Sequence, residues 1–164
     1  MIKLYYNFNL ERLMKITSLC YLEQDGKYLM LHRVKKVNDE NHDKWIGIGG
    51  KFKDKESPFD CARREIREES GLCATELSYR GIVTFVSDLY GTEYMHLFTC
   101  ESFTGVLNYD CDEGDLLWVD KTKITELPIW EGDKIFLKLL RDNTPFFSLK
   151  LEYKGDTLVS YTLE

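Results

Sequence analysis

Runs of apolar and β-branched residues predict β-strands along most of this chain. The clearest runs cover residues 16–22, 28–34, 81–87, 94–101, 116–120, 146–153 and 157–163. Asp25-Gly26 separates the first two runs and Gly155 lies between the last two, as is typical of hairpin turns. The polar residues 34–44 predict a loop, and residues 45–50 predict a short strand that enters a glycine turn.

Two segments carry helical signals instead. Residues 57–70 begin with Ser57, a good N-cap, and Pro58, which suits the first helical position, while Gly71 suits the position just after the end. A second helix is expected over residues 133–141, with Ile135, Phe136, Leu139 and Leu140 on its apolar face. Strands before, between and after two helices predict a mixed α/β or α+β domain.

Length and composition limit the classes of protein. The 164 residues, 43% hydrophobic and 30% charged, are typical of one globular domain. We expect it over residues 15–164, after an extension at 1–14 that is either a genuine arm or the product of an upstream start site. No apolar run reaches the roughly 18 residues of a membrane span, and no signal-peptide layout begins the chain. The five widely spaced cysteines indicate reduced thiols, so we expect a cytoplasmic protein without a membrane partner.

The net charge of −6 argues against a protein that coats a nucleic-acid polymer through its phosphates. It leaves a small nucleotide substrate open, because a bound metal ion can supply the positive charge. Neither composition nor pattern distinguishes a monomer from a dimer.

Three carboxylates crowd one edge of the first helix. Glu65, Glu68 and Glu69 stand at i, i+3 and i+4, a spacing at which like charges destabilise a helix by about 0.2–0.5 kcal/mol per pair. Glu68 and Glu69 also occupy the last turn, where the helix dipole disfavours anions. A hard divalent cation, Mg²⁺ or Mn²⁺, would relieve both unfavourable features. The alternative is a solvated acidic face softened by neighbouring arginines (Arg63, Arg64 and Arg67), and these observations leave both interpretations open.

The segment around this helix resembles a known motif. Gly50 is followed by five residues, Glu56, seven residues and the run Arg64-Glu65-Ile66-Arg67-Glu68-Glu69-Ser70-Gly71-Leu72, which matches the Nudix box without a departure. A chance match is on the order of 10⁻⁸ per start position. The resemblance implies the Nudix fold, a mixed β-sheet sandwiched between helices with the box as a loop–helix–loop. It also implies Mg²⁺-dependent hydrolysis of a nucleoside diphosphate linked to another group.

The same resemblance implies roles for the box residues. Glu68 and Glu69 would be metal ligands, and Glu65 either a ligand or the base that activates water. Arg64 and Glu56 would form an ion pair that orients these carboxylates. At the start of the box, the backbone of Gly49 and Gly50 would approach the metal and the phosphates, and Lys51 would contact a phosphate.

Segments outside the box are similar to the MutT-like hydrolases of oxidised purine nucleoside triphosphates. They are residues 45–51, 128–133 and 153–163. This resemblance implies that Trp130 stacks on the purine and that Asp133 hydrogen-bonds the edge of the base. The alternative for Trp130 is simple core packing.

Four further positions follow from this comparison. Ile46 stands at the base-contacting position where animal enzymes of the branch carry Asn, and Gly132 replaces an additional acid. Glu113 matches a carboxylate that approaches the metal, although an acidic turn is an equal alternative. Arg33 matches a basic residue near the phosphates, although it could equally be a solvated edge residue.

The function expected from these resemblances is hydrolysis of a purine nucleoside triphosphate of the 8-oxo-dGTP class. The products would be the nucleoside monophosphate and pyrophosphate, which would cleanse the nucleotide pool and protect DNA. The alternatives are hydrolysis of a nucleotide sugar or an RNA 5′ end, and a non-catalytic nucleotide-binding module that regulates a partner. The complete set of box carboxylates counts against the last alternative.

Overall fold

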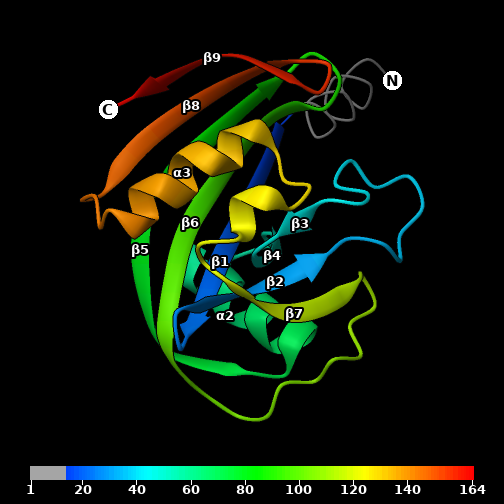
Figure 1. Ribbon diagram of the computed structural model, residues 1–164, viewed down its shortest axis with the longest axis vertical. Coiled ribbons are helices and arrows are strands. Elements are labelled where there is room, and N and C mark those ends of the chain that lie inside the picture. Colours follow the sequence, from blue (N-terminus) through cyan, green and yellow to red (C-terminus); the bar gives the residue numbers. More distant parts are fainter. Residues whose placement is uncertain (1–13) are drawn as a thin grey trace.

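A mixed β-sheet with one helix on each side forms the body of the molecule. The computed structural model describes residues 14–164, so residues 1–13 of the expected extension lie outside the described residues. The strands follow the order β3-β2-β1-β6-β5-β8-β9, while β4 pairs with β1 and β7 with β2 (Figure 1). The strands are β1 (Met14–Gln24), β2 (Lys27–His32), β3 (Trp45–Ile46), β4 (Ile48–Lys51), β5 (Cys73–Ser87), β6 (Gly91–Thr104), β7 (Asp115–Asp120), β8 (Phe147–Lys154) and β9 (Thr157–Leu163). The α-helices are α2 (Pro58–Ser70) and α3 (Glu131–Arg141), and Ile124–Glu126 form a short 3-10 helix, η1.

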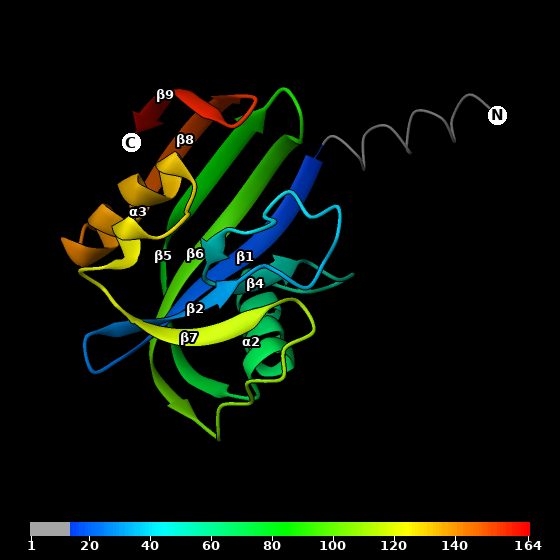
Figure 2. The ribbon, with the colours of Figure 1, turned by 45° about the vertical axis from the view of Figure 1, so that its right-hand side comes forward.

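The two helices cover opposite faces of the central strands, as Figure 2 shows. Along β1, Leu19 and Tyr21 pack in the core beneath α3, whereas Cys20 and Leu22 pack in the core beneath α2. This follows from the period of two in a strand, which sends successive side chains to opposite faces. The continuous apolar run of β1 therefore serves two cores, and the expected sandwich is confirmed.

Local sequence signals account for the position of α2. The Ser57 hydroxyl accepts a hydrogen bond from the Asp60 backbone amide, and the Asp60 carboxylate accepts one from the Ser57 amide, which forms a capping box. Gly71 ends the helix at φ 74°, a left-handed conformation that glycine adopts without a Cβ clash. The predicted start and end of this helix are confirmed.

Several element boundaries differ from the prediction. β5 begins at Cys73 rather than at residue 81, and its pairing with β6 shifts register three times before Gly81. These bulges disturb the alternation that identifies a strand in sequence. The expected strand at 45–50 is two strands that pair with different partners, β3 with β2 and β4 with β1. α3 begins at Glu131, two residues before the predicted start. Within residues 14–164, no helix combines the length and the apolar character needed to cross a membrane.

Candidate active site

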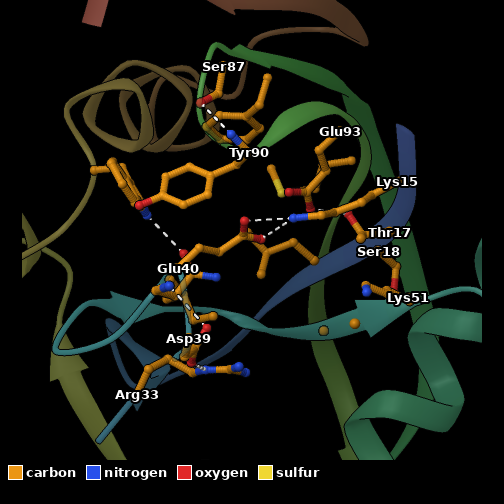
Figure 3. Close-up of a pocket in the computed structure, with 18 of the residues that line it drawn as sticks. Lys15, Thr17, Ser18, Arg33, Asp39, Glu40, Lys51, Ser87, Tyr90 and Glu93 are labelled. Carbon is orange, nitrogen blue, oxygen red and sulfur yellow. Dashed lines mark hydrogen bonds and ion pairs between the residues drawn. The ribbon is translucent and has the colours of Figure 1, made fainter. Parts of the chain in front are cut away.

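One large pocket opens beside the central strands, between the loop that follows β2 and the start of α3. Its volume is about 780 Å³, and its lining includes residues of seven elements (β1, β3, β4, β5, β6, β8 and α2), of the 33–44 loop and of the first turn of α3 (Figure 3). Nine residues singled out in the sequence line it together: Arg33, Ile46, Gly49, Gly50, Lys51, Glu65, Glu113, Trp130 and Asp133. Residues far apart in the chain are therefore assembled in one cavity.

The other four predicted residues, Glu56, Arg64, Glu68 and Glu69, do not line this pocket. Glu69 is buried directly behind the lining, where its Oε2 accepts a hydrogen bond from the Gly49 amide at 3.2 Å. Glu68 is on the surface, with 49% of its side chain exposed. The box carboxylates thus occupy three environments: Glu65 in the pocket, Glu69 behind it and Glu68 beside it.

The expected ion pair between Arg64 and Glu56 is present. The guanidinium donates from Nε to Glu56 Oε1 at 2.5 Å and from Nη2 to Oε2 at 2.9 Å. Its Nη2 also donates to the Lys51 carbonyl at 3.0 Å, which ties the helix to the strand that carries the glycines. The hydrogen bond from Arg64 lowers the pKa of Glu56 from 4.5 to about 2. This two-pronged contact fixes the orientation of Arg64.

Arg64 also holds two of the helix carboxylates. Its Nη1 lies 2.5 Å from Glu65 Oε1 and 3.0 Å from Glu68 Oε2. The other two arginines are engaged differently: Arg63 stacks over the Phe59 ring, and Arg67 contacts the Cys73 sulfur. Among the contacts of residues 14–164, Arg64 is therefore the only one of the three arginines that forms ion pairs with carboxylates of this helix.

Burial opposes ionisation of the carboxylates at this end of the pocket. Burial raises the pKa of Glu65, and burial together with the neighbouring Glu113 raises the pKa of Glu69 well above its ordinary value. Burial opposes ionisation of Glu113 as well, but ion pairs with Lys36 and Arg33 lower its pKa overall. A cation bound beside these carboxylates would favour their ionised forms and lower their pKa values.

The chemical type of the side chains at this end of the pocket suits a hard divalent cation. Glu65 lies against Gly50, Glu69 accepts a hydrogen bond from the Gly49 amide, and Glu113 neighbours Glu69. Carboxylate oxygens are the ligands that Mg²⁺ and Mn²⁺ prefer. A Cβ at residue 50 would lie 2.6 Å from Glu65 Oε1, so only glycine admits the carboxylate there. Within residues 14–164, no group of three or more His, Cys, Asp or Glu side chains is arranged closely enough to hold a metal ion. Glu68 is instead bound by Lys53, and Glu113 forms ion pairs with Arg33 and Lys36.

Trp130 forms an aromatic wall at the opposite end of the pocket. Its Nε1 donates to Asn41 Oδ1 at 2.9 Å, and the Lys44 ammonium lies 4.9 Å from its ring centroid. The Tyr153 ring meets it edge-on at 5.6 Å between centroids. The indole also packs against the core beneath α3, so Trp130 both lines the pocket and takes part in core packing, and stacking on a purine remains a prediction.

Asp133 is 3% exposed and presents a carboxyl to the same pocket. Burial, and then the charge of Glu93, raises its pKa well above the ordinary value. At Gly132, a Cβ would lie 2.5 Å from Leu151 Cδ1 and 2.8 Å from the Tyr153 hydroxyl, so both side chains would have to shift to admit one. The Gly132 amide donates to the Tyr153 hydroxyl at 2.7 Å, which holds this ring beside the start of α3.

The sequence prediction missed several polar residues of the pocket. Thr17 Oγ1 donates to Glu93 Oε1 at 2.6 Å, and Lys15 Nζ lies 2.6 Å from both carboxylate oxygens of Glu40 (Figure 3). Asn41, which binds Trp130, is in the loop that was predicted only as polar. One signal was available: Glu93 stands on the face of its strand that also carries buried Met95 and Leu97, where a carboxylate is unexpected.

The fold and this site define a hydrolase in which a cluster of carboxylates adjoins a pocket large enough for a nucleotide. The NUDIX domain family matches residues 14–140, and the chain therefore belongs to the Nudix family. It is a MutT-like Nudix hydrolase, an enzyme that acts on pyrophosphate bonds. Nudix enzymes generally depend on divalent metal ions and bind small nucleotide-type substrates.

Relatives of similar length support this assignment. An uncharacterized Nudix hydrolase of Bacillus subtilis is 30% identical over 93% of this chain and 95% of its own. An oxidized purine nucleoside triphosphate hydrolase of Danio rerio is 30% identical over 92% of this chain and 94% of its own. The crystal structure of a MutT protein from Bacillus halodurans superposes with a TM-score of 0.81 at 24% identity, covering 92% of this chain and 97% of that one, which shows the shared fold.

Proposed function

We propose that this protein hydrolyses a purine nucleoside triphosphate of the 8-oxo-dGTP class in a Mg²⁺-dependent reaction. One water is consumed, the bridge between the α- and β-phosphoryl groups breaks, and the nucleoside monophosphate and pyrophosphate leave. In the cytoplasmic nucleotide pool this would remove mutagenic precursors of DNA. The observation that carries the proposal is that one pocket contains both Glu65 with the glycine backbone and, at its other end, Trp130 with Asp133. Residues 15–164 would form this catalytic domain, with residues 1–14 as an extension.

At the phosphate end, this chain's residues would bind and orient the triphosphate. Glu65, Glu68, Glu69 and Glu113 would hold Mg²⁺, or Mn²⁺ in its place, and the bound ion would neutralise phosphate charge and lower the pKa of water. Arg64 positions two of these carboxylates through contacts of 2.5 and 3.0 Å to Glu65 and Glu68. Arg33 and Lys51, which line the pocket beside them, would contact phosphate oxygens.

At the base end, Trp130 would stack on the purine and the buried Asp133 would hydrogen-bond its edge. A planar aromatic surface binds any base, whereas a buried carboxyl discriminates between bases by the hydrogen-bond donors that they present. Ile46 lines the same pocket and would contact the base only through apolar atoms. The names of the fish and mouse relatives, both oxidized purine nucleoside triphosphate hydrolases, support the same substrate class.

A pyrophosphate-release assay with Mg²⁺ tests the proposal directly. Normal and oxidised purine nucleoside triphosphates and a nucleotide sugar are compared at equal concentration, with and without a chelator. We expect turnover of the oxidised purine to exceed that of its normal counterpart and to stop when the metal is removed. Turnover of the nucleotide sugar alone would retain the Nudix chemistry and reject this substrate class. Binding of nucleotides without turnover would favour a regulatory module.

A further inference from the structure

Glu93 is a carboxylate that the proposed chemistry leaves unused. It lies near the start of β6 on the face that also carries Met95 and Leu97, both buried in the core beneath α3. Its side chain lines the pocket, together with Asp133 from the first turn of α3. A carboxylate on an apolar face costs folding free energy unless its polar atoms are satisfied. Its presence there therefore requires an explanation.

The protein supplies Glu93 with only part of its hydrogen bonding. Within residues 14–164, the Thr17 hydroxyl is the side-chain donor that reaches it, at 2.6 Å from Oε1. Lys15 is its neighbour across the β1–β6 pairing, but the Lys15 ammonium binds both oxygens of Glu40 instead. Figure 3 shows Lys15 directed to Glu40, with Thr17 beside Glu93. The second oxygen, Oε2, has no hydrogen-bond donor among the described residues.

We propose that Glu93 determines base specificity by accepting a hydrogen bond from an N–H group of the bound purine. This inference rests on the proposed function and adds a second carboxyl to the base-reading group that contains Asp133. Thr17 fixes one oxygen of Glu93, which leaves the other for the ligand. Burial raises the pKa of Glu93, whereas the Thr17 hydrogen bond and the charges of Lys15 and Lys51 lower it, and an N–H donor at the free oxygen would favour the carboxylate form further.

The chemistry of oxidised purines fits this arrangement. In guanine, N7 carries a lone pair that accepts hydrogen bonds. Oxidation at C8 converts that position into an N–H donor. A carboxylate facing N7 therefore attracts the oxidised base and repels the normal one, and unpaired buried polar groups make such discrimination strong. Glu93 would favour the oxidised substrate through this contact, while Asp133 binds another edge of the same base.

The test is Glu93→Gln, which keeps the shape of the side chain but presents an amide. Thr17 can still donate to the amide oxygen, so the NH₂ group turns towards the base. We expect the ratio of kcat/KM for 8-oxo-dGTP to that for dGTP to fall by about 10- to 100-fold. We expect the melting temperature to stay the same or rise, because a carboxylate has left an apolar face. A purely structural role for Glu93 would not change this ratio.

Glu101→Gln is the matched control, because Glu101 is an exposed residue on the same strand. Thr17→Val is a second variant that removes the hydroxyl bound to Glu93, and we expect a smaller fall in the same ratio. An unchanged ratio in Glu93→Gln overturns the inference even if the wild-type protein prefers the oxidised substrate. If the wild-type protein turns over neither triphosphate, calorimetric titration with 8-oxo-dGMP and dGMP decides. Loss of a wild-type preference in Glu93→Gln supports the inference, and equal binding of both ligands by the wild-type protein overturns it.

Discussion

The two ends of the pocket are built in different ways. The end proposed to bind phosphates is lined mainly by one stretch of the chain, residues 49–53 and Glu65, with Arg33 and Glu113 added from the loops after β2 and before β7. The base end is assembled from residues distant in the chain, including Thr17, Glu93 and Trp130. If the proposed roles hold, the reaction chemistry depends on residues close in sequence, whereas base recognition depends on residues that only the tertiary fold brings together. Substitutions at the first end should affect every substrate equally, and those at the second should change the preference among them.

Glu69→Gln should have the largest effect. Burial and the adjacent Glu113 raise the pKa of Glu69, and a neutral amide there cannot supply the charge that holds a cation. We expect kcat to fall by about 10²- to 10³-fold, a loss typical of removing one preorganised electrostatic group. If the phosphate end serves all substrates alike, steady-state assays will show the same fall for oxidised and normal nucleotides.

Glu131→Gln is the control for this variant, because Glu131 is an exposed carboxylate with 61% of its side chain accessible. It should leave kcat unchanged. Mg²⁺ should raise the melting temperature of the wild-type protein more than that of Glu69→Gln, since a ligand stabilises the state that binds it. Preserved turnover in Glu69→Gln would remove the metal role assigned to this residue.

Trp130→Ala tests the other end of the pocket. Stacking of a base on an aromatic side chain is worth about 1–3 kcal/mol, so KM for purine nucleotides should rise by about 5- to 150-fold. The inhibition constant of inorganic triphosphate, which has no base, should not change. Trp130→Phe keeps an aromatic surface but loses the Nε1 hydrogen bond to Asn41 and should have a smaller effect. A matching loss of affinity for inorganic triphosphate would contradict the separation of the two ends.

The same division explains how much could be predicted from the sequence. The capping residue of α2, its terminal glycine and the Glu56–Arg64 pair depend on residues close in sequence, and each was predicted. The alternation of β6 marks Glu93 as an unexpected carboxylate, but its surroundings depend on the parallel pairing of β6 with β1, between strands far apart in the chain. Element boundaries failed for a similar reason, as the bulges of β5 are formed against β6 and leave little trace in β5 alone.

The smallest expected effect concerns the stability of the phosphate end. The hydrogen bond from Arg64 lowers the pKa of Glu56 from 4.5 to about 2 in the folded protein. A depressed folded pKa adds stability that is complete above 4.5 and is lost as the pH falls towards about 2. Glu56→Gln should therefore be less stable than the wild-type protein at neutral pH, by about 1 kcal/mol for a partly exposed pair. Urea unfolding across this range should show the two curves converging in acid. A difference that stays constant would mean that the substitution removes packing rather than charge, and the local ion pair would no longer explain how the phosphate end is held.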